Sequence, residues 1–520
     1  MMQYVLLQAI FLPLLLSPVA YILGKRSGPN AVTWFSFGIL AYCTAIMTLA
    51  SLSGTYEEHY PWTQQFGEFG LVLDGLASPF AIIIYVISTV VALFSKPYMI
   101  ARFTAQYEEK INSQKQVVGD GPTAMVESSS LKAHVNHQMG IYHALYLVMA
   151  MGMLGSVLAT NLVEFYVFFE VMLIPGFFMI AFWGYEAKRR VALLFFFWTH
   201  VGAVILLLGF LAIGLYVGSF NYSDIHEHAI PHNILVLAAV GIIIGLGVKM
   251  AAFVVHIWLP HTYRAAPTPL NALSSGAMLG VGAYGFFRLL AMLLPGEYAH
   301  FALFLNLWGV ATMLYGGIMA LVQDDIKKFF AYSSISQMGY ILFGIGTVSS
   351  LGLSGSEMLF VSHSLGKVIL FMMVGAIILQ VGTRSITKMG GLAGKMPITA
   401  TCAMIGVLTI AGIPPTSGFM AEWTMFNGAL QTAIQEGSTV RMVSFALGLI
   451  ATVITLAYSL WMIKRVFFGK LPEHLENTKE ANWYVTGPMM VLAGFTIVIG
   501  IYPDIFFNKI IPFMKGLVGV

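Results

Sequence analysis

The sequence predicts an all-α polytopic membrane protein with about fourteen transmembrane helices, and three observations lead to this fold class. Of its 520 residues, 58% are hydrophobic and only 9% are charged, whereas an average soluble domain has about 25% charged residues. Apolar runs long enough to cross a bilayer as a helix recur along the whole chain. Lysines and arginines are mostly confined to every second connection between these runs. Soluble enzymes, nucleic-acid-binding proteins and secreted domains are therefore excluded.

The individual spans follow from the length of the apolar runs. A bilayer core of about 30 Å takes about 20 helical residues. The N-terminus lacks the basic segment and the cleavage site of a signal peptide, so the first run is expected to remain as a helix. The predicted spans are 4–23, 31–53, 76–100, 140–158, 162–183, 191–217, 234–258, 268–294, 301–322, 329–348, 357–382, 397–428, 441–468 and 486–508.

The basic residues test this count, because cytoplasmic loops of membrane proteins carry an excess of lysine and arginine. Most of the 26 basic residues follow odd-numbered spans, for example Lys25 and Arg26 after the first span and Lys327 and Lys328 after the ninth. This alternation predicts that both termini lie on the non-cytoplasmic side. The polar stretch 102–138 is then a cytoplasmic loop.

The sequence offers no site for a resident metal or cofactor. Cys43 and Cys402 stand alone in apolar runs and cannot provide the four thiolates of an iron–sulfur cluster. His134 and His137 lie in the polar stretch without acidic or cysteine companions, as solvated histidines do. No phosphate-binding loop or dinucleotide-binding glycine motif is present.

Four charged residues lie inside apolar spans, where each costs about 2.5 to 3.5 kcal/mol unless it is paired, hydrated or used. They are Glu170, Lys249, Lys367 and Glu422. A structural ion pair between helices would account for one of them. Four in one chain, accompanied by histidines, favour a path for ions or protons.

The spacing of these residues suggests relays. Glu170 precedes Pro175, which weakens the helical hydrogen bonds around it, and if it faces Lys249 the two groups titrate as a pair. His256 follows Lys249 by seven residues, which places both on one face of a continuous helix. It is interpreted either as a relay or as an ordinary hydrogen-bonded histidine near a helix end.

His363 and Lys367 are four residues apart and share a helix face, which favours a functional role for the pair. Two segments indicate interrupted membrane helices, HIWLPHTYRAAPTPL after Lys249 and TIAGIPPTSGFMAEW before Glu422. Breaks in corresponding parts of two halves mark the transport site in transporters built from inverted repeats. The first segment is also compatible, in part, with a plain loop between two helices.

The motifs FFEVMLIP, VKMAAFVVHIWLP, APTP, LVQDDIKKFFAYSSISQMGY, SHSLGKVILF and GIPPTSGFMAEW together resemble the antiporter-like subunits of respiratory complex I. The subunit M group, the counterparts of mitochondrial subunit 4, is the most similar. The resemblance implies two inverted five-helix repeats with discontinuous helices seven and twelve. The implied organisation is N-terminal helices at 1–101, the polar loop at 102–138, a first repeat at 139–295, a second repeat at 296–470 and a last helix at 471–520.

The resemblance also implies a proton translocation path through the charged residues. That path consists of Glu170, Lys249, His256, His363, Lys367 and Glu422. Two positions depart from the family pattern: Gly280 replaces a lysine of helix eight, and Gln337 replaces a histidine. Glutamine can hold a water wire but cannot carry a proton as a cation, and the glycine leaves a cation missing between the two halves.

The function expected from this resemblance is proton translocation by a membrane-arm subunit of an NADH:quinone oxidoreductase or a related enzyme with another electron donor. Iron–sulfur clusters, flavin and quinone belong to partner subunits, which include subunit L-like and N-like homologues and small membrane subunits. The expected location is the cytoplasmic membrane. Two alternatives stay open: an Mrp-type cation/proton antiporter or membrane-bound hydrogenase subunit, and a structural subunit that conducts no protons. The direct binding of quinone is not expected.

Overall fold

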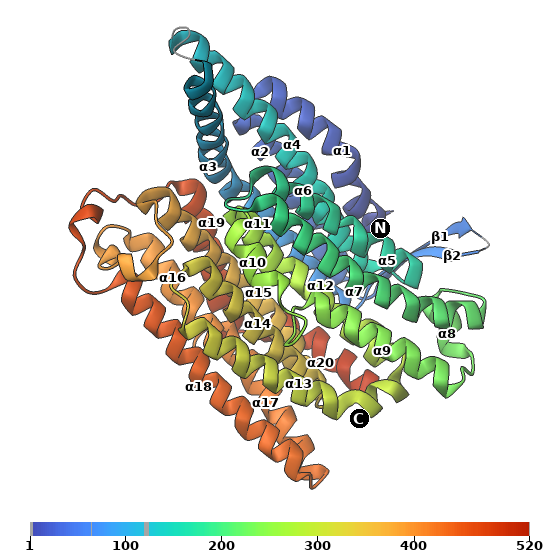
Figure 1. Ribbon diagram of the computed structural model, residues 1–520. Coiled ribbons are helices and arrows are strands. Elements are labelled where there is room, and N and C mark those ends of the chain that lie inside the picture. Colours follow the sequence, from blue (N-terminus) through green and yellow to red (C-terminus); the bar gives the residue numbers. More distant parts are fainter. Residues whose placement is uncertain (1–3, 64, 119–123, 519–520) are drawn as a thin grey trace.

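The computed structural model describes residues 4–63, 65–118 and 124–518, and it is built almost entirely of helices (Figure 1). The first part comprises α1 Val5–Ser27, α2 Pro29–Leu52, strands β1 Tyr56–Thr63 and β2 Gly67–Leu73, α3 Ala77–Val118 and α4 Ala124–Leu158. The middle comprises α5 Leu162–Val171, α6 Leu173–Trp183, α7 Lys188–Val217, α8 Tyr222–Glu227, α9 His232–Lys249, α10 Trp258–Ala265, α11 Thr268–Leu273 and α12 Leu279–Gly285. The last part comprises α13 Pro295–Leu321, α14 Ile326–Ile345, α15 Ser350–Val381, α16 Pro397–Ile410, α17 Ser417–Gln435, α18 Thr439–Phe467, α19 Trp483–Ile501 and α20 Asp504–Val518.

The helical membrane fold is confirmed, whereas the count of fourteen spans stays a prediction. Among the described residues, twelve helical segments are long and apolar enough to cross a membrane. The two other expected spans correspond to α14, which carries many serines, and to the pair α16 and α17, in which α16 has only 14 residues. Both discontinuities fall where the proline-containing segments predict them, after Lys249 and after Ile410.

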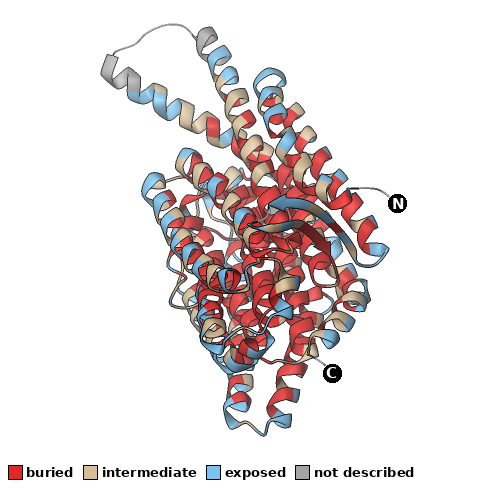
Figure 2. Cartoon of the chain, turned by 90° about the vertical axis from the view of Figure 1, so that its right-hand side faces the viewer, coloured by how far each residue is buried: buried red, intermediate tan, exposed pale blue. Residues whose placement is uncertain are grey.

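The centre of the bundle is formed by α15 and by the helix from Thr268 to Met292, in which nearly every residue is buried. That second helix contains two π-helical turns, Ser274–Met278 and Phe286–Met292. Figure 2 shows buried residues throughout the interior of the bundle and exposed ones on its outer helices. Beyond Arg189 and Arg190 in its first turn, the exposed residues of α7 are apolar, as expected of a face that meets lipid or another membrane protein. They include Leu193, Phe197, Val201, Leu208 and Leu215.

The prediction of a loop at 102–138 is wrong for the described part of that stretch. Helix α3 continues to Val118 and α4 begins at Ala124, so two helices extend beyond the bundle at one side (Figure 1). Glutamate, lysine and glutamine are good helix formers, so a polar sequence of this kind continues a helix once it leaves the membrane. The hydroxyls of Tyr107 on α3 and Ser130 on α4 are hydrogen-bonded across this extension.

The sequence did not predict two elements, the hairpin of β1 and β2 and the helix α20. Strands β1 and β2 form an antiparallel hairpin in which Tyr56 is paired with Leu73. Residues 504–508, expected at the end of the last span, belong instead to a separate amphipathic helix, α20. This helix begins just after Pro503, and its buried face consists of Phe506, Phe507, Ile510 and Met514.

A buried ion pair joins the start of α3 to the helix before α13. Both carboxylate oxygens of Asp74 contact the guanidinium of Arg288 at 2.8 Å, and Asp74 Oδ1 also accepts the backbone N–H groups of Leu76 and Ala77. Burial alone would raise the pKa of the Asp74 carboxyl, but Arg288 and the two amides outweigh it and hold this pKa below its usual range.

We expect Asp74→Asn to lower the free energy of unfolding by about 3 to 5 kcal/mol, because Arg288 would be left buried without its counter-charge. Since the pKa of Asp74 is depressed in the folded protein, its stabilisation is complete at neutral pH and is lost as pH falls through that value. Thermal unfolding in detergent at a series of pH values measures both effects. Replacement of the exposed Glu473 by glutamine is the control, and an equal loss there would refute the assignment.

Candidate functional site

Lys249 lies at the point where the seventh span is broken. It is the last residue of α9 and is only 2% exposed, and the chain after it turns through Ala251 and Val254, both with positive φ, before α10 begins. The C-terminal end of a helix carries a partial negative charge that favours a cation. The Lys249 ammonium lies 4.6 Å from the ring centroid of Phe169. The break therefore holds a cation at membrane depth without a directly bound carboxylate.

Glu170 is close enough to act electrostatically on Lys249, but its direct partner is His200. The Nδ1 atom of His200 lies 2.9 Å from Oε2 of Glu170, while Oε1 of Glu170 is buried without a hydrogen-bond partner. Glu170 therefore acts on Lys249 at a distance in this conformation, and its direct contact is with His200. The side chains of Glu170 and His200 are 19% and 40% exposed, so this pair is accessible from outside the chain.

His256 does not share a helix face with Lys249, because the backbone between them is not helical. The seven-residue spacing therefore does not align the two side chains, and that part of the sequence argument is wrong. Instead, Nε2 of His256 lies 3.0 Å from the hydroxyl of Tyr315 on α13. Its Nδ1 atom is buried without a hydrogen-bond partner.

His363 and Lys367 lie on one face of the continuous helix α15, as their spacing predicts. The Lys367 ammonium donates to the hydroxyl of Ser333 at 2.6 Å, and Nε2 of His363 donates to the backbone carbonyl of Ser275 at 3.2 Å. Ser275 lies in a π-helical turn, whose altered hydrogen bonding makes such a carbonyl accessible. Both groups are fully buried in the centre of the bundle.

Hydroxyl groups continue from Lys367 towards Glu422. The hydroxyl of Ser333 lies 3.0 Å from that of Tyr458 on α18, and the hydroxyl of Tyr340 lies 3.0 Å from that of Thr455. Both tyrosines are within electrostatic reach of Glu422. Hydroxyls both accept and donate hydrogen bonds, so together with water they can conduct protons between a buried lysine and a buried carboxylate.

Glu422 on α17 faces the break of the twelfth span. A side-chain carbon on Gly412 would lie 2.5 Å from Glu422 Oε2, so the glycine makes room for the carboxylate at the interruption. The amide of Gln337 donates to the carbonyl of Ile410, the last residue of α16, at 3.1 Å. The residue that replaces the family's histidine therefore satisfies a carbonyl freed by the broken helix.

At Gly280, where the family pattern has a lysine, an aromatic ring fills the space that a side chain would need. Any side-chain carbon on Gly280 would overlap the ring of Phe360 on α15. That ring stacks on Phe80 of α3, with centroids 4.3 Å apart. Here an apolar barrier lies where the family pattern has a cation.

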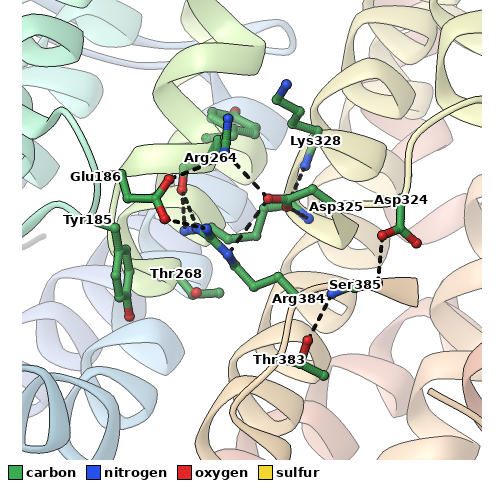
Figure 3. Close-up of polar contacts among 12 residues, drawn as sticks. Tyr185, Glu186, Arg264, Thr268, Asp324, Asp325, Lys328, Thr383, Arg384 and Ser385 are labelled. Atoms are coloured by element: carbon green, nitrogen blue, oxygen red, sulfur yellow. Dashed lines mark hydrogen bonds and ion pairs between the residues drawn. The ribbon is translucent and has the colours of Figure 1, made fainter. Parts of the chain in front are cut away.

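The short helix α10 is anchored by a charged network at its end (Figure 3). Arg264 pairs with Glu186 at 3.2 Å and with Asp325 at 3.8 Å, and Arg384 also pairs with both carboxylates, at 4.0 and 3.7 Å. Arg384 further donates to the backbone carbonyl of Arg264 at 3.0 Å. These bonds tie the broken seventh span to the connections before α7, before α14 and after α15.

Sequence reasoning missed His200 and Glu357. His200 is an ionisable residue inside a predicted span, the same signal that identified the other candidates. Glu357 is the first residue of the predicted span 357–382, so the sequence alone places its charge at the edge of the membrane. Helix α15 in fact begins at Ser350 and buries Glu357 completely, with both carboxylate oxygens unpaired.

Comparison with known proteins places the chain among membrane subunits of redox-linked and antiporter complexes. Residues 159–455 match the family described as NADH:quinone oxidoreductase/Mrp antiporter, TM. The chain is 33% identical over 376 residues to F420H2 dehydrogenase subunit M of Methanosarcina mazei, which covers 70% of this chain and 74% of that protein. It is also 33% identical over 370 residues to NADH-quinone oxidoreductase subunit M of Rickettsia bellii, covering 71% and 73%.

The fold is shared with a solved structure at low sequence identity. A chain of the Mrp complex from Dietzia sp. DQ12-45-1b superposes with a TM-score of 0.83 at 20% identity, covering 99% of this chain and 98% of that one.

Proposed function

The chain belongs to the NADH:quinone oxidoreductase/Mrp antiporter membrane family, and we propose that it translocates protons as a membrane-arm subunit of a complex I-type oxidoreductase. The observation that carries this proposal is the succession of buried ionisable groups between the two helix breaks. Lys249 stands at the first break, His363 and Lys367 at the centre, and Glu422 at the second. Buried charges in apolar helices are expensive unless they serve a path of this kind.

In this proposal the Glu170–His200 pair is the group that responds to the redox reaction in the partner subunits. Because the pair is partly exposed at membrane depth, a charge on a neighbouring subunit can act on it directly. A shift of Glu170 from His200 towards Lys249 changes the proton affinity of the lysine, which then passes its proton towards Lys367 and Glu422. Lys249 regains a proton from the cytoplasmic side through water.

The free energy from rearranging an ion pair can be compared with the work of moving a proton against the membrane potential. Moving one charge against 100 mV takes about 2.3 kcal/mol. The rearrangement of an ion pair changes proton affinity by one to three pKa units, which corresponds to about 1.4 to 4 kcal/mol. A rearrangement worth about two pKa units or more, which is about 2.7 kcal/mol, is therefore sufficient to move one proton per cycle.

The wider assignments are parts of the same proposal. Redox centres and the quinone site belong to partner subunits, which include L-like and N-like antiporter homologues and small membrane subunits. Relatives named for NADH and for F420H2 suggest that the electron donor is chosen by those partners. The chain spans the cytoplasmic membrane with both termini on the non-cytoplasmic side, as the distribution of basic residues indicates.

An Mrp-type antiporter is the second candidate, because the family includes Mrp subunits and the fold matches one closely. The resemblance assigns a glutamate at position 422 to subunit M, and a lysine to the L and N subunits of complex I and to Mrp relatives. Glu422 therefore favours a subunit M-like role over an Mrp-type antiporter. A sodium gradient applied to vesicles without any electron donor separates the two. Proton exchange under that condition supports an antiporter, whereas uptake only during donor oxidation supports the redox-coupled pump.

We expect Glu170→Gln to abolish most donor-driven proton uptake by inverted vesicles that contain the intact complex, because the neutral amide cannot respond to a neighbouring charge. Donor oxidation should slow with it, since the two processes are coupled. Glu473→Gln is the control, as it removes an exposed carboxylate outside the site and should change uptake little. Unchanged oxidation and uptake in Glu170→Gln would instead support a structural subunit that conducts no protons.

A further inference from the structure

Glu357 is a buried carboxylate that the proposed path does not use. It lies on α15 with 0% exposure, and neither of its oxygens has a hydrogen-bond partner. Asp74, Arg288 and Tyr284 are the charged and titratable groups within its electrostatic reach. Asp74 and Arg288 neutralise each other, and Arg288 also donates to the Tyr284 hydroxyl at 2.7 Å. Glu357 therefore has no dedicated counter-charge, unlike an ordinary structural carboxylate.

The position of Glu357 on α15 connects it to the central lysine. At 100° per residue, Glu357, Phe360, Ser364 and Lys367 lie on one quarter of the helix circumference. Glu357 and Lys367 are separated by about 15 Å along the helix, at 1.5 Å per residue. Ser364 between them has a buried hydroxyl without a partner. The only side chain of this stripe that cannot form hydrogen bonds is Phe360, which stacks on Phe80.

The other side of the cluster opens outward. Arg288 lines a pocket of about 670 Å³ together with Tyr222, His226 and Phe513. Asp74 lines a second pocket, of about 240 Å³, which also includes Phe513. Phe513 belongs to α20, so both pockets lie against this amphipathic helix. This is the side that the basic-residue pattern assigns to the non-cytoplasmic face.

We propose that Glu357 is the proton-release group of the outward path, that the stacked rings of Phe360 and Phe80 form its gate, and that the pockets beside α20 are its exit. This inference rests on the proposed function. When the rings part, water enters, and the Glu357 carboxylate takes a proton that Lys367 has released to water. The carboxylic acid then transfers this proton to water on the pocket side, beside Arg288, and returns to the carboxylate. A narrow apolar constriction excludes water while it is closed, which prevents backflow.

The test compares variants of the intact complex in inverted vesicles during donor oxidation. We expect Glu357→Gln to lose most proton uptake per donor oxidised and Glu357→Asp to recover part of it, since aspartate keeps the ionisable group. Ser356→Ala, which removes a neighbouring buried hydroxyl without a partner, should behave as wild type. Full uptake in Glu357→Gln, alongside lost uptake in Glu170→Gln, overturns the release site and leaves the proposed function intact. Full uptake in both overturns the proposed function as well.

A second measurement tests the gate without turnover and applies even if Glu357→Gln fails to assemble. Liposomes that contain the complex with Phe360→Ala are given a pH gradient in the absence of donor. We expect a proton leak that wild type does not show, reversed by the larger side chain of Phe360→Leu. The absence of a leak from Phe360→Ala overturns the gate.

Discussion

Replacing Lys249 with alanine is expected to reduce proton transfer through this chain by about 100-fold, the lower end of what a positioned proton-transfer group contributes. Among the described residues of the first helix break, Lys249 is the cation, and the other lysine of the path, Lys367, is on a different helix and bound to Ser333. The fold should tolerate the change, because removing a buried charge that has no direct carboxylate partner leaves no ion unpaired. Proton uptake and donor oxidation in inverted vesicles measure the effect.

A second variant, Lys249→Arg, distinguishes a proton-transfer role of Lys249 from a purely electrostatic one. Arginine keeps the positive charge but does not release its proton in proteins, so it should preserve the electrostatic environment and still block transfer. Lys188→Ala is the control for loss of a lysine outside the site, since Lys188 is part-exposed and donates to the carbonyl of Phe182. If Lys249→Arg pumps normally, Lys249 acts as a fixed charge and the relay through it does not exist.

The sequence predicts those features that depend on local composition. Each span is a long apolar run, and each broken helix combines prolines with a neighbouring charge, so both could be placed without knowledge of the packing. The pairing of His363 with Lys367 was also predictable, because α15 is continuous and a four-residue spacing then fixes a common face.

What the sequence could not predict depends on how helices rotate against one another. Glu170 selects His200 rather than Lys249 because of the way α7 packs beside α5 and α6. His256 does not share a helix face with Lys249 because the chain unwinds between them, which removes the periodicity on which the prediction depended. The cluster around Glu357 joins residues 74, 288 and 357, and no spacing rule connects positions so far apart.

The two departures from the family pattern also acquire physical meaning only in three dimensions. Gln337 completes the hydrogen bonding of a broken helix, which a neutral amide does without taking part in proton transfer. Gly280 makes room for the ring of Phe360, which stacks on Phe80. A subunit that lacks the central cation thus has an apolar barrier in its place.

The reverse substitution, Gly280→Lys, is therefore expected to prevent stable assembly, although it restores the residue of the family pattern. Its side chain would overlap the ring of Phe360, which is fully buried and held by Phe80. Overpacking a dense core costs about 1 to 3 kcal/mol and occasionally more, and a lysine in the middle of a span adds about 2.5 to 3.5 kcal/mol. The yield of assembled complex and its thermal unfolding in detergent measure the loss.

The double variant Gly280→Lys with Phe360→Ala separates steric overlap from the burial of charge. Removing the ring frees the volume that the lysine needs, so assembly should recover to a large extent relative to Gly280→Lys alone. The lysine would then stand between Lys249 and Lys367, where the resemblance places a relay cation, and water could reach it through the space vacated by the ring. A double variant as unstable as the single one would show that Phe360 does not exclude the lysine. In that case the absence of the cation would have a cause other than the aromatic stack.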